Sequence, residues 1–243
     1  RIFSMRIDGV GAIHLGVIWS QWDGYSGEAE TIYHHYLSQG NVHYPARVDW
    51  GESLRCSDVE THTGRHPVAV LGENRGDYPD PGYGNAYRLA VVSDHDGAIY
   101  CSIAQVMETG VDLVWTTISL DDETWSYSMP TCCFQRDPVT PDLVVVFRAY
   151  RSSTEPVNTK YLIWNVGDVW TSSPSFGVSA SYEITGDSAE LPEAPPVIAI
   201  NDDGDLCVAY IGENQNVYAL LKDSTGYTTH QISGDGETST ETE

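Results

Sequence analysis

The sequence predicts an all-β protein built from repeated four-stranded antiparallel sheets. Short runs rich in Val, Ile, Thr and Tyr alternate with clusters of Gly, Pro, Asp and Asn, which is typical of strands joined by turns. No sustained apolar stripe with a 3.6-residue period occurs, so long amphipathic helices are not expected. A four-strand pattern recurs four times along the chain. Hydrophobic residues make up 41% of the sequence, which is enough for a packed core.

Each repeat contains four predicted strands separated by short polar turns. The clearest repeat has its strands at 196–200, 206–210, 217–221 and 227–232. The second repeat has them at 67–71, 87–92, 98–103 and 114–118. The third has them at 130–134, 143–147, 160–164 and 170–176, and the first at 3–7, 13–19, 31–36 and 43–48. A proline begins the first strand of the second, third and fourth repeats, where a missing N–H costs least.

Four-stranded antiparallel units of roughly 40–60 residues are typical of the blades of a β-propeller, in which neighbouring blades cover each other's apolar faces. We therefore predict one propeller domain over residues 1–233, either a compact four-bladed ring or part of a larger ring. Its blades are expected at about 1–55, 65–120, 129–178 and 194–233. Residues 234–243 include no apolar side chain and are predicted to be an acidic polar tail.

The charge of the chain excludes two classes of partner. Lys and Arg number 12 and Asp and Glu number 35, so the net charge is 12 − 35 = −23. Nucleic acid and anionic membrane surfaces both require a basic footprint, so neither is an expected partner. No apolar run approaches the ~18 residues that a membrane-spanning helix requires. The sequence begins at Arg1 with no signal peptide before it, which we interpret as a processed or excised product compatible with export to an extracellular location.

The cysteines do not favour a metal centre. Their number is odd, so at least one thiol stays unpaired in any intramolecular scheme, and the redox state of the others is open. No Cys-x-x-Cys spacing occurs, so a structural zinc site is not expected. The five are Cys56, Cys101, Cys132, Cys133 and Cys207.

Several segments resemble the sialidase-like (neuraminidase-repeat) propellers. They are Asp8-x-x-Gly11-Ala-Ile-His14, Ile32-Tyr-His-His-Tyr36, and Asn201-Asp-Asp-Gly-Asp-Leu206 followed by Val217-Tyr218. Ser93-Asp-His-Asp-Gly-Ala-Ile-Tyr100 approximates the Asp-box of that superfamily, with His95 where the box has Asp. The resemblance implies a propeller fold. It also implies that, if the chain is an enzyme, an arginine such as Arg148 would bind a substrate carboxylate.

The candidate catalytic residues are His34, His35, His43 and Arg148. A His/Tyr pair that acts as base and acid would suit a polysaccharide lyase, and a pair of histidines would suit a metal ion. His34 and His35 face opposite ways on a strand, whereas His43 follows a turn and is able to approach one of them. The structural alternative is that these histidines pack beside aromatic residues and that the arginine forms ion pairs.

Aromatic residues interleaved with acidic and amide side chains indicate a sugar-binding surface in the first repeat. Sugar C–H faces stack on aromatic rings, and sugar hydroxyls find hydrogen-bond acceptors beside them. Hydrophobic packing between blades is the alternative. A tyrosine in the long insertion at 72–86 adds a further contact surface, because insertions often carry binding. The predicted ligand-binding residues are Trp19, Trp22, Tyr25, Trp50 and Tyr83.

Oxygen-bearing side chains alternate around a glycine at Asn201, Asp203 and Asp205, in a pattern that is able to hold Ca²⁺. The same letters are favoured in a hairpin turn for conformational reasons alone. No other cofactor is expected.

These observations favour an extracellular carbohydrate-binding or adhesive module whose partner is a glycan surface. Nothing in the sequence identifies it as an enzyme. A polysaccharide-cleaving enzyme of the sialidase-like superfamily, either hydrolase or lyase, is the first alternative. The second is a structural subunit of a surface or filament assembly that associates with its own copies.

Overall fold

A computed structural model of the chain contains strands, turns and loops, and no α-helix among the residues that it describes. The described backbone comprises residues 2–6, 13–22, 29–38, 53–55, 65–72, 87–106, 115–134, 142–151, 158–168, 182–185, 191, 194–201, 203–212 and 215–233. Side chains are described for residues 66–70, 90–103, 117–134, 143–151, 159–167, 182–185, 191, 194–201, 203–212 and 215–233. A search of this part of the chain finds no helix with the length and apolar character needed to cross a membrane.

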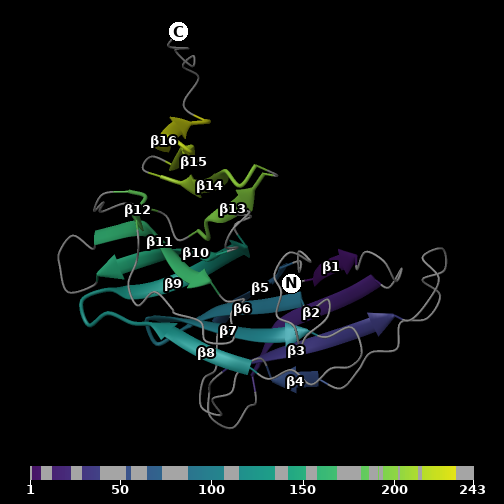
Figure 1. Ribbon diagram of the computed structural model, residues 1–243. Coiled ribbons are helices and arrows are strands. Elements are labelled where there is room, and N and C mark those ends of the chain that lie inside the picture. Colours follow the sequence, from purple (N-terminus) through teal and green to yellow (C-terminus); the bar gives the residue numbers. More distant parts are fainter. Residues whose placement is uncertain are drawn as a thin grey trace.

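Four antiparallel sheets follow one another along the chain, and each consists of four consecutive strands (Figure 1). Sheet one contains β1 (Ile2–Arg6), β2 (Ile13–Trp22), β3 (Ala29–Ser38) and β4 (Ser53–Arg55). Sheet two contains β5 (Arg65–Gly72), β6 (Tyr87–His95), β7 (Ala98–Val106) and β8 (Trp115–Leu120). Sheet three contains β9 (Ser126–Phe134), β10 (Asp142–Arg151), β11 (Asn158–Asp168) and β12 (Tyr182–Glu183). Sheet four contains β13 (Val197–Ile200), β14 (Leu206–Ile211), β15 (Val217–Asp223) and β16 (Gly226–Gln231).

The predicted pattern of four-stranded antiparallel sheets is confirmed. The fourth strands are the elements for which the sequence is least informative. The predicted strands at 43–48 and 170–176 lie outside the described residues, and the strands that pair with β3 and β11 are β4 and β12. These two strands contain three and two residues, which is too short for an alternating apolar pattern to identify them.

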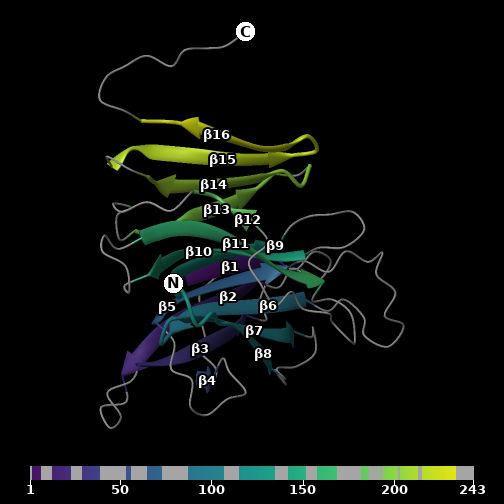
Figure 2. The same ribbon diagram turned by 90° about the vertical axis from the view of Figure 1, so that its left-hand side faces the viewer.

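The sheets are arranged with their first strands toward the middle of the molecule. In Figures 1 and 2, β1, β5, β9 and β13 lie toward the centre, and β4, β8 and β16 lie toward the outside. β9 contacts β5 and β6 of sheet two and β13 of sheet four, while β5 contacts β1, β2 and β3 of sheet one. The sheets therefore follow one another in chain order, with sheets one and four at the two ends of the series.

Sheet three is covered on both faces. Val145 and Phe147 belong to a core that sheets two and three share, and Val144 and Val146 belong to a second core shared with sheet four. Because successive side chains of a strand point to opposite faces, an uninterrupted apolar run such as Leu143–Phe147 fits a strand buried on both sides. Each of these five residues is at most 2% exposed. Burial of both faces makes sheet three the centre of the described core.

Candidate functional site

The aromatic residues predicted to bind sugar are placed only in part. Trp19 and Trp22 lie on β2, at positions that alternate to opposite faces of sheet one. Tyr25, Trp50 and Tyr83 fall outside the described residues, and no side-chain contact is described for any of the five. This surface stays a prediction.

The predicted histidines are placed at backbone level. His34 and His35 lie on β3, where they pair with Val17 and Gly16 of β2. His34 is therefore on the same face of sheet one as Trp19 and His35 is on the other face, since side chains alternate along the strand. His43 falls outside the described residues. A catalytic role for the three stays a prediction.

Arg148 lies on β10, in sheet three, and its Nη2 lies 3.5 Å from the carbonyl oxygen of Leu191. The guanidinium carbon lies 5.7 Å from the ring centre of Tyr150. The Nε atom is buried, and it has no hydrogen-bond partner among the described residues. Burial raises the pKa of the nearby Tyr161, and the positive charge of Arg148 acts in the opposite direction. The described surroundings of Arg148 are thus aromatic and carbonyl groups.

The loop predicted to bind calcium closes on itself through hydrogen bonds. The backbone N–H of Asp205 donates to Oδ1 of Asn201 over 2.8 Å, and Nδ2 of Asn201 donates to Oδ2 of Asp205 over 2.9 Å. Gly204 has a φ of 89°, which the turn requires. No group of three or more metal-ligating side chains is found within the described parts of the chain. Calcium binding by Asn201, Asp203 and Asp205 stays a prediction.

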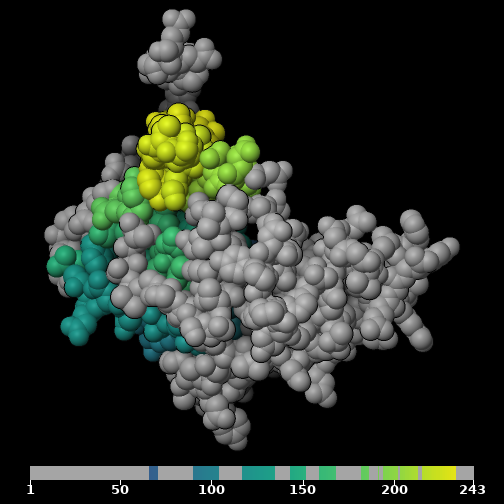
Figure 3. Space-filling model, viewed as in Figure 1, coloured from purple at the N-terminus to yellow at the C-terminus, as the bar shows by residue number. Residues whose placement is uncertain are grey.

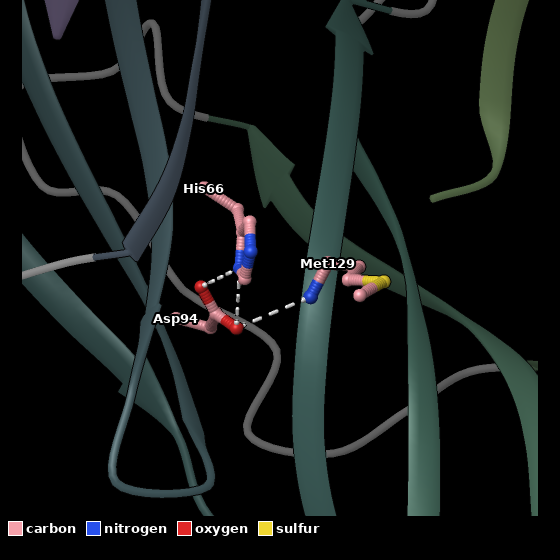
Figure 4. Close-up of polar contacts among 3 residues, drawn as sticks. All are labelled: His66, Asp94 and Met129. Carbon is pink, nitrogen blue, oxygen red and sulfur yellow. Dashed lines mark hydrogen bonds and ion pairs between the residues drawn. The ribbon is translucent and has the colours of Figure 1, made fainter. Parts of the chain in front are cut away.

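A cluster that the sequence did not single out joins sheets two and three (Figure 4). Nδ1 of His66, on β5, lies 3.0 and 3.1 Å from the two carboxylate oxygens of Asp94, on β6. The backbone N–H of Met129, on β9, donates to Oδ2 of Asp94 over 3.3 Å. Asp94 is 6% exposed, so the carboxylate holds both partners from a buried position.

Two residues of this cluster adopt an unusual backbone conformation. His66 has a φ of 48° and Met129 a φ of 55°, and each precedes a proline, at Pro67 and Pro130. Residues before proline normally adopt extended conformations, and non-glycine residues rarely have positive φ. The register of each first strand shifts at this point. Asp94 therefore stabilises two equivalent irregularities on neighbouring sheets.

The geometry orients the imidazole of His66. A carboxylate accepts hydrogen bonds, so Nδ1 is the donor to Asp94 and Nε2 of the neutral ring is the acceptor. The His66 side chain is 53% exposed, whereas that of Asp94 is 9% exposed. An exposed imidazole oriented by a buried carboxylate is chemically suited to accept a proton from a bound molecule.

A polar cleft of about 200 Å³ lies at the junction of sheets two and three. Several of the residues that line it are close in the sequence to Asp94 and Met129 of the cluster. Asp96 and Gly97 from the β6–β7 turn line one part of it, and residues 121–125 between β8 and β9, with Ser126 at the start of β9, line another. Tyr150 and Arg151 at the end of β10 complete it. Several carboxylates thus line the same cleft as one guanidinium and one phenol.

The carboxylates of the cleft differ in their roles. Asp122 accepts a hydrogen bond from the backbone N–H of Thr124 over 2.7 Å, and this bond is the main cause of its lowered pKa. Asp122 therefore shapes the loop. Burial raises the pKa of Tyr100, and the charges of Asp121 and then Asp96 raise it further. Four acidic side chains and one arginine line the cleft, so its field is negative.

Trp125 is held by cations and by the core. Nζ of Lys160 lies 4.2 Å from the ring centre and the guanidinium carbon of Arg151 lies 6.0 Å from it. Lys160 in turn forms an ion pair with Glu183 over 2.9 Å. The Trp125 ring also packs against the core between sheets two and three. Polar groups, rather than an open aromatic face, are therefore the features that the cleft offers to a ligand.

No protein-family model matches the chain, and no curated protein sequence is significantly similar to it. The resemblance to sialidase-like propellers therefore rests on the short segments of the sequence alone.

Proposed function

We propose that the chain is an extracellular carbohydrate-binding module of propeller type, which attaches to glycan surfaces through the cleft between sheets two and three. The observation that carries the proposal is the convergence of exposed carboxylates with Tyr150 and Arg151 around one cleft. Sugar hydroxyls donate to carboxylates and accept from guanidinium and phenol groups, so one ring is able to use both kinds of partner. The cleft volume is below the roughly 300–1,000 Å³ of sites that enclose a drug-sized ligand, which favours a single sugar unit.

The negative field narrows the class of sugar. Asp96, Asp121 and Glu123 are all exposed at the cleft, and the whole chain carries a net charge of −23. An anionic sugar would be repelled, whereas a neutral or amino sugar would not. We therefore propose neutral or amino sugars as ligands, in contrast to the acidic sugars that sialidase-like enzymes cleave.

Binding to an array of neutral, amino and anionic glycans tests this proposal. Asp121→Asn and Glu123→Gln are expected to weaken the preferred glycan about tenfold each, because a hydrogen bond to a charged group contributes roughly 1.5–3 kcal/mol. Calorimetric titration of each variant measures the change. Asp223→Asn removes an exposed carboxylate at the end of β15, outside the cleft lining, and is the matched control, with unchanged affinity expected. Selective binding of anionic glycans, or equal affinity of all variants, would contradict the proposal.

The His66–Asp94 pair supports a second candidate function, polysaccharide cleavage by an enzyme of the sialidase-like class. Nε2 of His66 would act as the general base, a role that typically contributes 10²–10⁴-fold to a rate. A depolymerisation screen on neutral and acidic polysaccharides tests for turnover. His66→Ala would then lower the rate about a hundredfold, and His34→Ala and His35→Ala would show whether sheet one carries the chemistry instead. Glycan binding without any turnover would favour the binding module.

A further inference from the structure

We propose that the outer face of sheet four is an interface between copies of this chain, where it is covered by sheet one of a second copy. Two chains would then form one ring of sheets related by a two-fold axis. The inference goes beyond glycan binding and stands on the register and burial of the last three sheets.

The first step is an equivalence between three sheets. In each first strand, the residue directly after the proline pairs with a residue of the second strand. The pairs are Val68 with Val92, Thr131 with Val146, and Val197 with Ala209. Because side chains alternate, these pairs define the same face in sheets two, three and four. We call this the forward face of each sheet.

The forward faces of sheets two and three are covered by the next sheet. Val92 lies in the core between sheets two and three, and Val146 lies in the core between sheets three and four. Both are fully buried, and their partners Val68 and Thr131 are each 5% exposed. A forward face in this protein is thus an apolar surface that another sheet normally covers.

Within the described parts of the chain, the forward face of sheet four has no such cover. Val197 is 62% exposed and Leu221 is 42% exposed, although both hold forward-face positions. Ile232 follows β16 and is 63% exposed, and its N–H bonds the carbonyl oxygen of Val217. Figure 3 shows the last sheet, in light green to yellow, standing at the surface of the molecule.

This face is apolar along β13 and β14, and Asp223, Thr228 and His230 lie on it at the β15–β16 edge. Cys207, Ala209, Ile211 and Leu221 follow one another across β14 and β15 on the forward side, as the register places them. The opposite side of the same strands carries Val208 and the other residues that pack on sheet three. The three β14 residues are half-buried and Leu221 is exposed, and contiguous apolar residues that stay partly accessible in this way mark interaction sites.

We expect sheet one of a second copy of the chain to cover the forward face of sheet four. Sheets one and four lie at opposite ends of the series of sheets (Figure 1), so a ring needs a partner at both ends. A two-fold pair supplies both contacts at once, and such closed pairs are the commonest oligomers. Strand spacing and rise give one four-stranded face an area of about 400 Å². Each contact buries two such faces, one on each chain, so the two contacts bury about 1,600 Å² in total, which is the usual size of a stable interface.

The net charge predicts how this association depends on salt. Each chain carries −23, so two copies repel each other, whereas the strands of the forward face carry one carboxylate, that of Asp223 at the end of β15. Salt screens the repulsion and strengthens the apolar contact. The dimer fraction is therefore expected to rise between 0.05 and about 1 M NaCl, as the Debye length falls from over ~10 Å to ~3 Å.

Sedimentation equilibrium and light scattering of the full chain at 1–100 µM test the proposal. At high salt, we expect the natural sequence to have the mass of a dimer. The Val197→Asp and Leu221→Asp variants are expected to have the mass of a monomer. Ser224→Asp adds the same charge to the exposed β15–β16 turn, outside the forward face, and should remain dimeric. Circular dichroism and the unfolding midpoint show that the variants are folded.

Two results would overturn the proposal. A natural chain that sediments as a monomer throughout this range would show that no second copy covers the face. Val197→Asp and Leu221→Asp variants as dimeric as Ser224→Asp would place the interface elsewhere. Mass spectrometry of Cys207 alkylation adds an independent readout. Its thiol should be protected in the dimer and should react at least tenfold faster in the Val197→Asp monomer.

Discussion

At the scale of single residues, Asp94 connects two sheets through one carboxylate. It accepts hydrogen bonds from the side chain of His66 in sheet two and from the backbone of Met129 in sheet three. Both partners have positive φ, a conformation that costs of order 1–3 kcal/mol unless its surroundings stabilise it. A buried carboxylate with two donors supplies that stabilisation.

We expect Asp94→Ala to lower the free energy of unfolding by about 2–3 kcal/mol, because it leaves the N–H of Met129 without its acceptor. Urea denaturation followed by fluorescence measures the change. His66→Ala removes only the exposed partner and should cost less than about 1 kcal/mol. Equal costs for the two variants would show that the bond to Met129 contributes nothing.

At the scale of elements, the β6–β7 hairpin is the part that brings the cluster and the cleft together. Its two-residue turn consists of Asp96 and Gly97, with φ values of 46° and 84°, as a type I′ turn requires. The N–H of Tyr127 donates to the carbonyl oxygen of Gly97 over 2.6 Å, so the turn also positions the start of β9. The Asp-Gly pair is visible in the sequence, but its contact with β9 is not.

Gly97→Ala is expected to destabilise the protein by about 2 kcal/mol. An alanine at this position would have to adopt a left-handed φ, which costs roughly 1–2 kcal/mol. Its Cβ would add a steric cost. It would lie 3.2 Å from Oγ and 3.3 Å from Cβ of Ser126. Thermal unfolding measures the loss. The double variant with Ser126→Gly removes the crowding but not the φ strain, so it should recover part of the stability, and no recovery would contradict the steric part of this prediction.

At the scale of the whole molecule, coverage of sheet faces differs along the chain. β10 has apolar side chains buried on both faces, whereas β14 alternates between buried residues on one face and half-buried residues on the other. Local opening of a sheet is easier where fewer apolar contacts hold it. Sheet three should therefore be the most stable part of the described fold.

Native-state hydrogen exchange compares the stability of sheets three and four. The Val197→Asp variant is used, because it keeps sheet four free of a partner. We expect the amides of Val144 to Phe147 to exchange only through global unfolding. Amides of β14 and β15 should exchange at least tenfold faster. Equal protection of β10 and β14 would mean that the sheets unfold as one unit.

The sequence by itself determined the order and spacing of the strands and turns of this protein. Alternating apolar residues, Asp-Gly turns and strand-opening prolines are local signals, and the second strands, such as 143–147, were predicted from them because a strand covered on both faces must be apolar throughout. The short outer strand at Tyr182–Glu183 carries no such signal, since it is defined only by its pairing with β11.

Only the tertiary structure decided which residues meet. Asp94 and Met129 are 35 positions apart, and neither Trp125 nor Arg151 has a local pattern that marks the cleft. Packing of one sheet on the next brings these side chains together, and periodicity within a strand contains no information on that packing. The same reason applies to sheet four, where sequence alternation shows an apolar face and only the fold shows that Val197 and Leu221 on that face are exposed.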